Sequence, residues 1–575
     1  MNRSSAAKPT DLRSVTEEIL AREAVLREGG GESGRKRQKK LNRLTARERI
    51  AALLDAPDAF LELNLWAAYG MYEEWGQVPA AGVVTGIGAV EGRDCMVIAN
   101  DATVKAGAFF PQTAKKVIRA QRIAAMCNLP LIYLVDSAGV FLPMQDEIFP
   151  DEDDFGRIFR NNAVFSAMGI PQIAAIMGNC VAGGAYLPVL CDKLLMTEGS
   201  ALNLAGPALV KAAIGQEVDG EELGGARMHA ETSGTVDFRE KDDESCIKRL
   251  RELVALIPLP PREGLGEGEG SKLGAARSQG QTHPRLAALG GTSLSSLREL
   301  PLPKREGSVD PSRGANDLYK LIGTQYDAHN LLGCIADADS VHEYKADYGK
   351  TLLCAYARVV GRAVGVIANQ HVTVKSKTKG FQLGGVIYGD SADKAARFVM
   401  DCEQNRLPIV FFQDVQGFMV GRDAEQSGII RSGAKLVNAV SNVTVPKITV
   451  VVGGSFGAGN YALCGKAFDP TFLFAWPGAK YAVMGGAQAA ETLLSLEERK
   501  AKGAGRQLDD ADRRRLRETI KNRYDSQTDI RYAAARGWID AIIAPHTTRD
   551  VLIRALRYAT RPRPTGGFRS GVFQV

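Results

Sequence analysis

The sequence predicts an α/β protein with two similar domains in tandem, because one module occurs twice and each copy alternates strand and helix patterns. The paired positions keep their order and spacing: Gly92-Arg93 and Gly361-Arg362, Val97–Asn100 and Val366–Asn369, Lys116 and Lys394, Asp136 and Asp414, Pro171 and Pro446, Tyr186 and Tyr461. Their offsets stay between 269 and 278 residues. A repeat of this length indicates two domains of one architecture.

Short β-branched and aromatic runs predict the buried strands, and apolar periodicity predicts the helices. The strands are expected at 131–135, 173–177, 409–412 and 448–452, and helices at 112–126 and 392–403. Each helical pattern precedes the first strand of its pair. This alternation favours mainly buried strands in an α/β arrangement.

Composition indicates an ordinary soluble globular chain of 575 residues, with 45% hydrophobic and 24% charged residues. The net charge of +6 is the difference between 72 basic and 66 acidic residues, and no basic stripe with interleaved aromatics stands out. We therefore expect no nucleic-acid partner, whereas a small anionic ligand is compatible with this charge. No apolar run reaches the roughly 18 residues of a spanning helix, so no membrane association is expected.

The cysteines and the N-terminus both favour a protein of the reducing cytoplasm. The nine cysteines form no CxxC pair and no spacing typical of metal ligands, so we expect neither a disulfide framework nor a bound metal. Residues 1–40 are polar and lack the apolar core of a signal peptide. Five glutamates in this stretch argue against a mitochondrial transit peptide.

Composition changes along the chain divide it into five segments. We expect an N-terminal helical and basic segment at 1–45, a first domain at 46–257, a low-complexity disordered insertion at 258–313, a second domain at 314–555 and a tail at 556–575. The insertion is rich in Gly, Pro, Ser and Arg, which leaves too little apolar surface for a core. The basic run at 35–40 is either a solvated surface or a docking site for a polyanionic ligand.

Each module ends in a glycine-rich turn between a buried strand and a helical pattern, at 177–186 and 452–461. Residues without side chains let the backbone approach a ligand closely. The first N–H groups of the following helix have no partner within it, so they can stabilise an oxygen that acquires negative charge. Gly183 and Gly184 would form one such oxyanion hole, and Ala458 and Gly459 the other. The alternative is that these glycines only permit tight packing of strand against helix.

Neither turn carries a recognisable nucleophile or base. They match neither the GxxxxGK[ST] phosphate loop nor the GxSxG nucleophile elbow. Cys180 and Ser455 lie nearby, but we interpret His229 as structural, and Asp136 and Asp414 as caps of the turns that follow their strands. A site of this kind needs its base from a substrate or cofactor.

Several strings in the sequence are similar to one enzyme family. They are Asn100–Lys105, Phe149–Arg157, Ala182–Tyr186, Gly417–Gly421, Gly453–Tyr461 and Trp476-Pro477 with Val483–Gly486. The chain thereby resembles the carboxyltransferase (beta) subunits of biotin-dependent acyl-CoA carboxylases, most closely the methylcrotonyl-CoA type, over roughly 40–257 and 314–555. The resemblance implies two tandem crotonase-like domains of repeated β-β-α units.

The resemblance also implies a division of labour between the domains. The first would bind the acyl-CoA, with Gly183 and Gly184 holding the thioester oxygen, and the second would bind carboxybiotin, with Ala458 and Gly459 polarising the ureido oxygen. The implied acyl-CoA contacts are Lys105, Lys115, Lys116, Ala138, Gly139 and Ala182, with the basic run at 35–40. The implied biotin contacts are Gly417, Phe418, Gly457 and Tyr461. The two lysines at 115 and 116 could equally be plain surface charges.

No biotin-attachment motif and no ATP-binding loop is present. The resemblance therefore implies a separate alpha subunit that carries and carboxylates biotin, and an oligomer of beta subunits. Three residues depart from the usual pattern, namely Ala138 in Asp-Ser-Ala-Gly, Met144 and Lys480, and these concern the acyl group. We favour 3-methylcrotonyl-CoA as substrate. The alternatives are a propionyl- or acetyl-CoA carboxylase beta subunit, a glutaconyl-CoA type decarboxylase subunit, a crotonase-type hydratase or hydrolase, and an acyl-CoA-binding scaffold.

Overall fold

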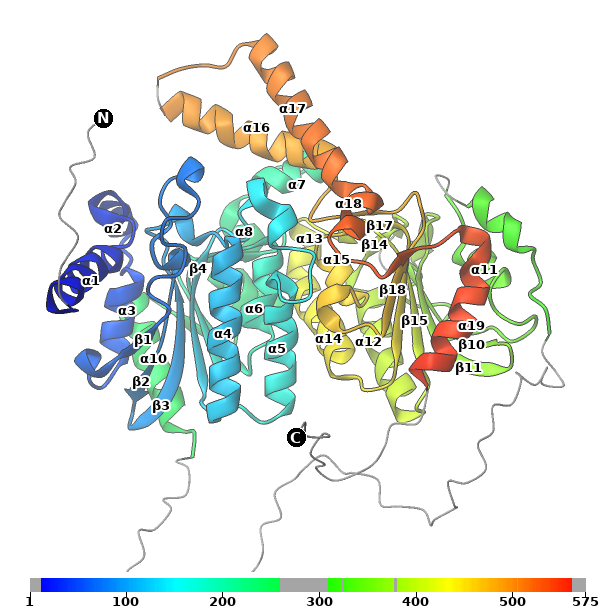
Figure 1. Cartoon of the computed structure of the whole chain (residues 1–575), viewed down its shortest axis with the longest axis horizontal. Helices are drawn as coiled ribbons and strands as arrows, with labels where there is room; N and C mark the ends of the chain where they lie inside the picture. The colour runs from blue at the N-terminus through cyan, green and yellow to red at the C-terminus, as the bar shows by residue number, and fades with distance from the viewer. Residues whose placement is uncertain (1–11, 259–308, 322–324, 377–379, 504, 561–575) are drawn as a thin grey trace, which may run out of the picture.

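The computed structural model describes residues 12–258, 309–321, 325–376, 380–503 and 505–560, and they form two similar α/β units (Figure 1). The first unit has an eight-stranded sheet of order β1-β2-β3-β4-β5-β6-β8, with β7 beside β5. The second has the matching order β9-β10-β11-β15-β17-β18-β20, with β19 beside β17. The expected fold of repeated β-β-α units is confirmed. Most of the expected insertion and tail lies outside the described residues.

Each sheet begins with antiparallel strands and continues with parallel ones. The first comprises β1 (Leu61–Leu63), β2 (Val83–Val90), β3 (Arg93–Asn100), β4 (Leu131–Ser137), β5 (Gln172–Val181), β6 (Lys193–Thr197), β7 (Ala201–Asn203) and β8 (Phe238–Glu240). The second comprises β9 (His342–Glu343), β10 (Leu352–Val359), β11 (Arg362–Asn369), β15 (Ile409–Val415), β17 (Lys447–Phe456), β18 (Phe472–Ala475), β19 (Lys480–Ala482) and β20 (Ala541–Ile542). Two small sheets pair β12 (Val374–Ser376) with β13 (Gly380–Gln382), and β14 (Val386–Ile387) with β16 (Gly417–Phe418).

The duplication extends to the turns of the β2-β3 and β10-β11 hairpins. Both residues of each turn are left-handed, with φ of 49° and 69° at Glu91-Gly92 and of 50° and 70° at Val360-Gly361. This conformation matches the twist of the strands it joins. The Asp55 carboxylate accepts both turn amides of the first hairpin, at 3.0 and 2.8 Å. Asp337 does the same in the second, at 2.9 and 2.7 Å.

Helices cover both faces of each sheet. The inner ones are α4 (Pro111–Cys127), α5 (Phe155–Ala167), α6 (Tyr186–Val189), α12 (Gly389–Gln404), α14 (Ile429–Asn442) and α15 (Gly457–Ala462), and the outer ones are α3 (Ala46–Leu53), α10 (Asp243–Ala255), α11 (Ala328–Gly333) and α19 (Thr548–Ala559). The inner helices of both units lie between the two sheets (Figure 1). One apolar core runs through both inner layers, so the two units share a core.

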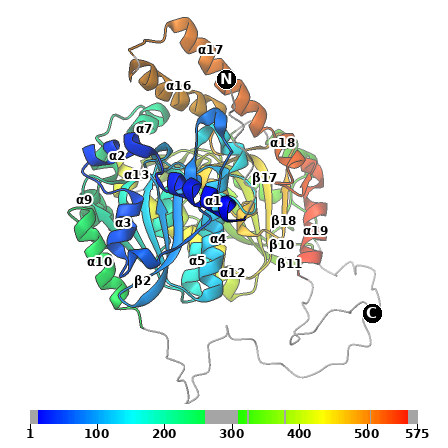
Figure 2. The same ribbon diagram turned by 60° about the vertical axis from the view of Figure 1, so that its left-hand side comes forward.

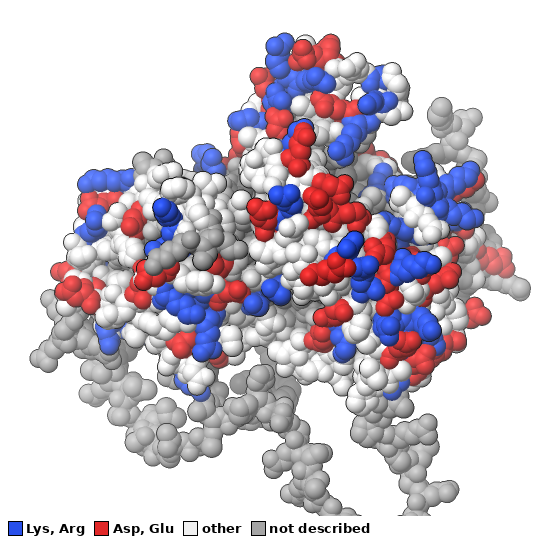
Figure 3. Space-filling model, turned by 180° about the vertical axis from the view of Figure 1, so that it is seen from behind, with Lys and Arg blue, Asp and Glu red and all other residues white. Residues whose placement is uncertain are grey.

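The remaining α-helices lie outside these inner and outer layers. They are α1 (Leu12–Arg27), α2 (Gly31–Lys40), α7 (Pro207–Ile214), α8 (Gly220–Gly224), α9 (Ala226–Met228), α13 (Arg422–Gln426), α16 (Gly486–Gly503), α17 (Asp510–Thr528) and α18 (Ile530–Ala535). The α16–α17 hairpin projects from the body of the molecule (Figure 2). Basic and acidic side chains are interspersed over the face shown in Figure 3. Among the described helices, none is both long and apolar enough to cross a membrane.

Candidate active site: two matched turns

The two glycine turns occupy the same place in their units, directly after β5 and β17. Each begins with a left-handed residue, Ala182 at φ 60° and Gly457 at φ 54°. Alanine rarely adopts this conformation, so the first turn carries backbone strain of the kind found at functional sites. The chain then enters a short helix, a 3₁₀ helix over Ala182–Ala185 in the first unit and α15 in the second.

The two helix types follow from the residue four positions after the second glycine of each pair, which is Pro188 after Gly184 and Leu463 after Gly459. The Leu463 amide donates to the carbonyl oxygen of Gly459, at 3.1 Å. The matching residue in the first unit is Pro188, which has no N–H to donate to Gly184. The thiol of Cys180 donates to the Gly184 carbonyl instead, at 3.5 Å. Because an α-helix leaves one more leading amide outside its own bonds than a 3₁₀ helix, the second turn offers more free donors than the first.

A buried aspartate fixes the strand ahead of each turn. Oδ1 of Asp136 accepts the Asn179 amide at 3.1 Å, and Oδ1 of Asp414 accepts the Gly454 amide at 2.8 Å. A methyl group added to Gly178 or Gly453 would lie only 2.0 or 2.2 Å from these carboxylates. Glycine is therefore required at both positions. The aspartates were expected to cap the turns that follow their own strands, but these bonds go to the neighbouring strands β5 and β17 instead.

The first aspartate is held by a buried arginine. Arg49, 1% exposed, lies 3.3 Å from Oδ2 of Asp136 and 2.8 Å from Oδ2 of Asp243. It also donates to the carbonyl oxygen of Met177 at 2.7 Å. Burial raises the pKa of Asp136, and the charge of Arg49 opposes that rise. This network makes the base of the first turn rigid.

Packing differs between the two turns. A methyl group on Gly184 would lie 3.8 Å from the Phe155 ring and 3.9 Å from the Cα of Gly139, which are ordinary contacts. A methyl group on Gly459 would lie 2.6 Å from Cγ2 of Val415. The second turn is therefore the more tightly packed. Phe155 borders the first turn, although only its motif, and not its contact with the glycines, was apparent from the sequence.

The polar side chains near the turns are engaged in the core. Ser455 donates to Gln413 at 2.6 Å and accepts from Asn460 at 2.8 Å. Burial raises the pKa of the Cys180 thiol, which keeps it protonated. The ring nitrogens of His229 contact Ser233 at 2.8 Å and the Leu202 carbonyl at 2.6 Å, and burial lowers its pKa to about 4. None of these three side chains is placed as an activated nucleophile or base.

Comparison with known proteins identifies the family. A model of the carboxyl transferase domain matches residues 37–267 and 292–565. The chain belongs to this carboxyltransferase family. It is 41% identical over 569 residues to the biotin-dependent 3-methylcrotonyl-coenzyme A carboxylase beta1 subunit of Mycobacterium tuberculosis, covering 98% of this chain and 97% of the relative. It is 40% identical over 567 residues to the mitochondrial methylcrotonoyl-CoA carboxylase beta chain of Arabidopsis thaliana, covering 98% and 88%.

Among solved structures, the beta subunit of P. aeruginosa geranyl-CoA carboxylase is 32% identical to this chain, with a TM-score of 0.41. The match spans 98% of this chain and 94% of that subunit. The relatives and the domain match together make the chain a carboxyltransferase of the biotin-dependent acyl-CoA carboxylases.

The lysines expected at the acyl-CoA site of this carboxyltransferase differ in exposure. Lys105 and Lys115 are exposed. Lys116 is 3% exposed, donates to the Ala80 carbonyl oxygen at 3.0 Å, and burial lowers its pKa to about 7. Lys116 therefore belongs to the core in this structure and presents no ammonium group to a phosphate.

The basic run at 35–40 forms most of helix α2, which packs against the loop before Lys105. The Gly30 amide donates to Oγ1 of Thr103 at 2.9 Å, and Arg37 donates to the carbonyl oxygen of Ala102. Lys39 and Lys40 are exposed. The structure thus brings the basic run next to the loop that carries Lys105.

Two residues expected to contact biotin, Phe418 and Tyr461, lie in the joint between the units of the carboxyltransferase. The Phe418 ring lies 5.7 Å from that of Tyr186. The Tyr461 hydroxyl donates to the Phe149 carbonyl oxygen at 3.0 Å, and its ring is 2% exposed. Both rings are therefore structural here. Gly417 has a left-handed backbone, with φ of 131°. It lies next to the second turn, because a methyl group added to Gly459 would be only 3.3 Å from the Gly417 Cα.

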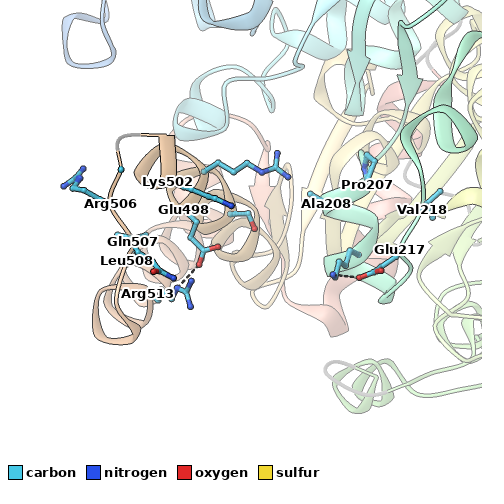
Figure 4. Close-up of a pocket in the computed structure, with 14 residues that line it drawn as sticks. Pro207, Ala208, Glu217, Val218, Glu498, Lys502, Arg506, Gln507, Leu508 and Arg513 are labelled. Atoms are coloured by element: carbon cyan, nitrogen blue, oxygen red, sulfur yellow. Dashed lines mark hydrogen bonds and ion pairs between the residues drawn. The ribbon is translucent and has the colours of Figure 1, made fainter.

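A cavity of about 880 Å³ lies away from the turns, between α7 and the α16–α17 hairpin (Figure 4). Lys211 and Glu217 pair at 2.5 Å on one wall, and Arg513 and Glu498 at 2.9 Å on the other. In the described residues no group of three or more His, Cys, Asp or Glu side chains is placed to hold a metal ion.

Proposed function

We propose that this chain transfers a carboxyl group from carboxybiotin to 3-methylcrotonyl-CoA, a small branched unsaturated acyl-CoA. The observation that carries the proposal is the pair of matched turns. Each combines a left-handed residue, leading amides and a buried aspartate, with no activated nucleophile beside it. Two such holes suit a reaction with two developing oxyanions, one on each substrate.

The first turn would serve the acyl-CoA. The amides of Gly183 and Gly184 would stabilise the thioester oxygen as the enolate forms, and the strained Ala182 would set their direction. Pre-organised donors of this kind contribute about 2.7–4 kcal/mol each to the stabilisation of a transition state. The Arg49 network, which anchors the preceding strand, would keep reorganisation small during the reaction.

The second turn would serve the ureido oxygen of carboxybiotin. The residues fit this group, because the amides of Ala458 and Gly459 precede the first bond of α15 and Gly457 and Gly417 present no side chain. Carboxybiotin supplies the carboxyl group and, once freed of it, a base that the described residues around the two turns do not offer. The chain's own task is then to bind and orient both substrates, which can contribute a large part of the rate.

An apolar cluster supports a hydrocarbon acyl group. Met144, one of the departures from the family pattern, is buried among the side chains of Tyr72, Phe110 and Val104, with Phe141 packed against them. This cluster is joined to the first turn through Gly139, whose carbonyl oxygen accepts the Phe109 amide at 2.8 Å. A buried apolar cluster near the first turn suits a branched hydrocarbon chain better than it would suit a carboxylate.

The CoA phosphates would contact exposed basic groups on the same side of the first unit. Lys105, Lys115 and the exposed lysines of α2, Lys39 and Lys40, are the groups we propose. Ala138 and Gly139 would border the thioester together with Ala182. Contacts of this type are electrostatic, so we expect binding of CoA to weaken as salt increases.

Biotin would arrive on a separate alpha subunit, since this chain has no attachment motif. We also propose that beta subunits associate with one another, so that a first unit faces the second unit of a neighbouring chain. Because the relatives include mitochondrial proteins, the compartment would be the cytoplasm in a bacterium and the matrix in a eukaryote.

The test is transfer of labelled carboxylate from a carboxylated biotin carrier, or from free carboxybiotin, to a panel of acyl-CoAs. Label on 3-methylcrotonyl-CoA would support both reaction and substrate. Label on propionyl-CoA or acetyl-CoA alone would refute the substrate. Folded protein that labels none of them would refute the proposed reaction.

A further inference from the structure

The two turn aspartates differ in what neutralises their second carboxylate oxygen. In the first unit that oxygen faces the guanidinium of Arg49, a permanent cation. In the second unit, Oδ2 of Asp414 accepts the Tyr326 hydroxyl at 3.1 Å and lies 3.4 Å from Nε2 of His371. The same structural position is thus served by an arginine in one unit and by a tyrosine hydroxyl and an imidazole ring in the other.

His371 is held firmly in this place. It follows the end of β11, and its amide donates to the Gln370 side chain at 3.0 Å. Its ring stacks on Tyr326, with centroids 5.3 Å apart and planes 6° from parallel. A methyl group on Gly385 would lie 3.6 Å from the ring. The ring therefore has little freedom to turn away from Asp414.

The surroundings select one tautomer of His371. Nδ1 is buried and has no hydrogen-bond partner in the part of the chain that the structure describes. A proton on Nδ1 would be an unpaired buried donor, which is unfavourable. A ring that carries its proton on Nε2, the atom 3.4 Å from Oδ2 of Asp414, is the tautomer that the structure accommodates.

Asp414 connects this ring to the second turn. Its other oxygen accepts the Gly454 amide at 2.8 Å, three residues ahead of the left-handed Gly457. No space for a side chain exists between them, since a methyl group on Gly453 would meet Asp414 at 2.2 Å. A change in the charge or position of the carboxylate is therefore passed to the backbone that enters the turn.

We propose that His371 is a positioning residue of the second turn, acting through Asp414. The inference rests on the proposed function of that turn. The groups that face the ring are Asp414 from β15 and Tyr326 from the loop before α11, while Asp327 bonds to Gln370 at 2.9 Å rather than to the ring. Removal of the ring would free one side of the Asp414 carboxylate, so the backbone that this carboxylate holds ahead of the turn should lose its fixed position and the transfer rate should fall.

The experiment compares the kcat and the KM for acyl-CoA of His371→Ala and His371→Gln with those of the wild type in carboxyl transfer. His371→Ala should lower kcat about tenfold, the loss expected for one polar contact to a charged group, and leave the KM for acyl-CoA unchanged. His371→Gln should recover most of kcat, because its amide can donate to Asp414. His342→Gln, an exposed position on β9, is the matched control and should behave as wild type.

An unchanged kcat in His371→Ala would overturn the proposal. A glutamine variant as impaired as the alanine variant, or an increase in the KM for acyl-CoA in both, would do the same, because either result indicates a general structural role. The wild-type rate separates this inference from the proposed function. Absence of transfer by the wild type refutes the proposed function, whereas normal transfer with a fully active His371→Ala refutes only the role of His371.

Discussion

Gly184→Ala and Gly459→Ala should have unequal effects, although the two glycines occupy matched positions. At Gly184 the added methyl group would meet its nearest neighbours at 3.8 and 3.9 Å, so the folded state can accept it. At Gly459 it would lie 2.6 and 3.1 Å from the two methyl groups of Val415 and 3.3 Å from the Cα of Gly417. Overlap of this size against a strand should destabilise the protein by about 1–3 kcal/mol. It should also move the amide of residue 459, with a loss of about 10²–10³ in kcat.

Removal of the clashing side chain supplies the test of cause. Val415→Ala in the Gly459→Ala background should restore much of the lost activity, because the methyl group then has space. The measurements are urea unfolding and single-turnover carboxyl transfer for both single variants and the double variant, analysed as a double-mutant cycle. Equal losses in Gly184→Ala and Gly459→Ala, or no coupling between positions 415 and 459, would refute the reasoning.

Three further predictions concern stability. Val360→Asn should raise the free energy of unfolding by about 1 kcal/mol, because a β-branched residue at φ 50° is strained and asparagine tolerates this conformation. The measurement is urea unfolding, and an unchanged midpoint urea concentration would contradict the prediction. Tyr461→Phe should destabilise the protein by about 1 kcal/mol, because it removes the hydrogen bond to the Phe149 carbonyl oxygen. Tyr186→Phe should leave stability unchanged, since within the described residues the Tyr186 hydroxyl has no partner. A larger loss of stability in Tyr186→Phe than in Tyr461→Phe would contradict this prediction. Burial raises the pKa of Glu425 to about 8, so the folded state keeps a proton that the unfolded chain releases above pH 4.5. The free energy of unfolding of the wild type, relative to that of Glu425→Gln, should therefore fall as pH rises from 4.5 through 8. The same dependence of unfolding free energy on pH in both proteins would exclude this linkage.

The fold was predictable because its determinants are local and occur twice. The strand expected at 131–135 is the core of β4, and the helix expected at 112–126 is α4 with one more residue at each end. A repeated hydrophobic pattern specifies a buried strand without knowledge of its neighbours. The break after the first helix was also predictable, since α1 ends at Arg27, just ahead of three glycines.

Burial of particular side chains was less predictable because it depends on contacts distant in sequence. Lys116 was expected to contact CoA or to be a surface charge, but its ammonium group donates to the Ala80 carbonyl oxygen, 36 residues earlier. Phe418 and Tyr461 were expected to contact biotin, and the structure places both rings in the joint between the units. The sequence contains the motif of each residue but carries no local sign of which unit its ring enters.

The joint also explains why each turn is followed by a tyrosine. Tyr186 extends from the first turn to Phe418 of the second unit, and Tyr461 extends from the second turn to Phe149 of the first. Each turn is therefore anchored in the other unit, so docking of the units and placement of the amides are one structural event. The contacts differ only where a neighbour differs, as with Pro188 and Leu463, or Arg49 and the Tyr326–His371 pair. Both turns present backbone amides in the same way, but their neighbours differ. The repeat would therefore account for the two proposed holes, and its divergence for the separate substrates that we propose for them.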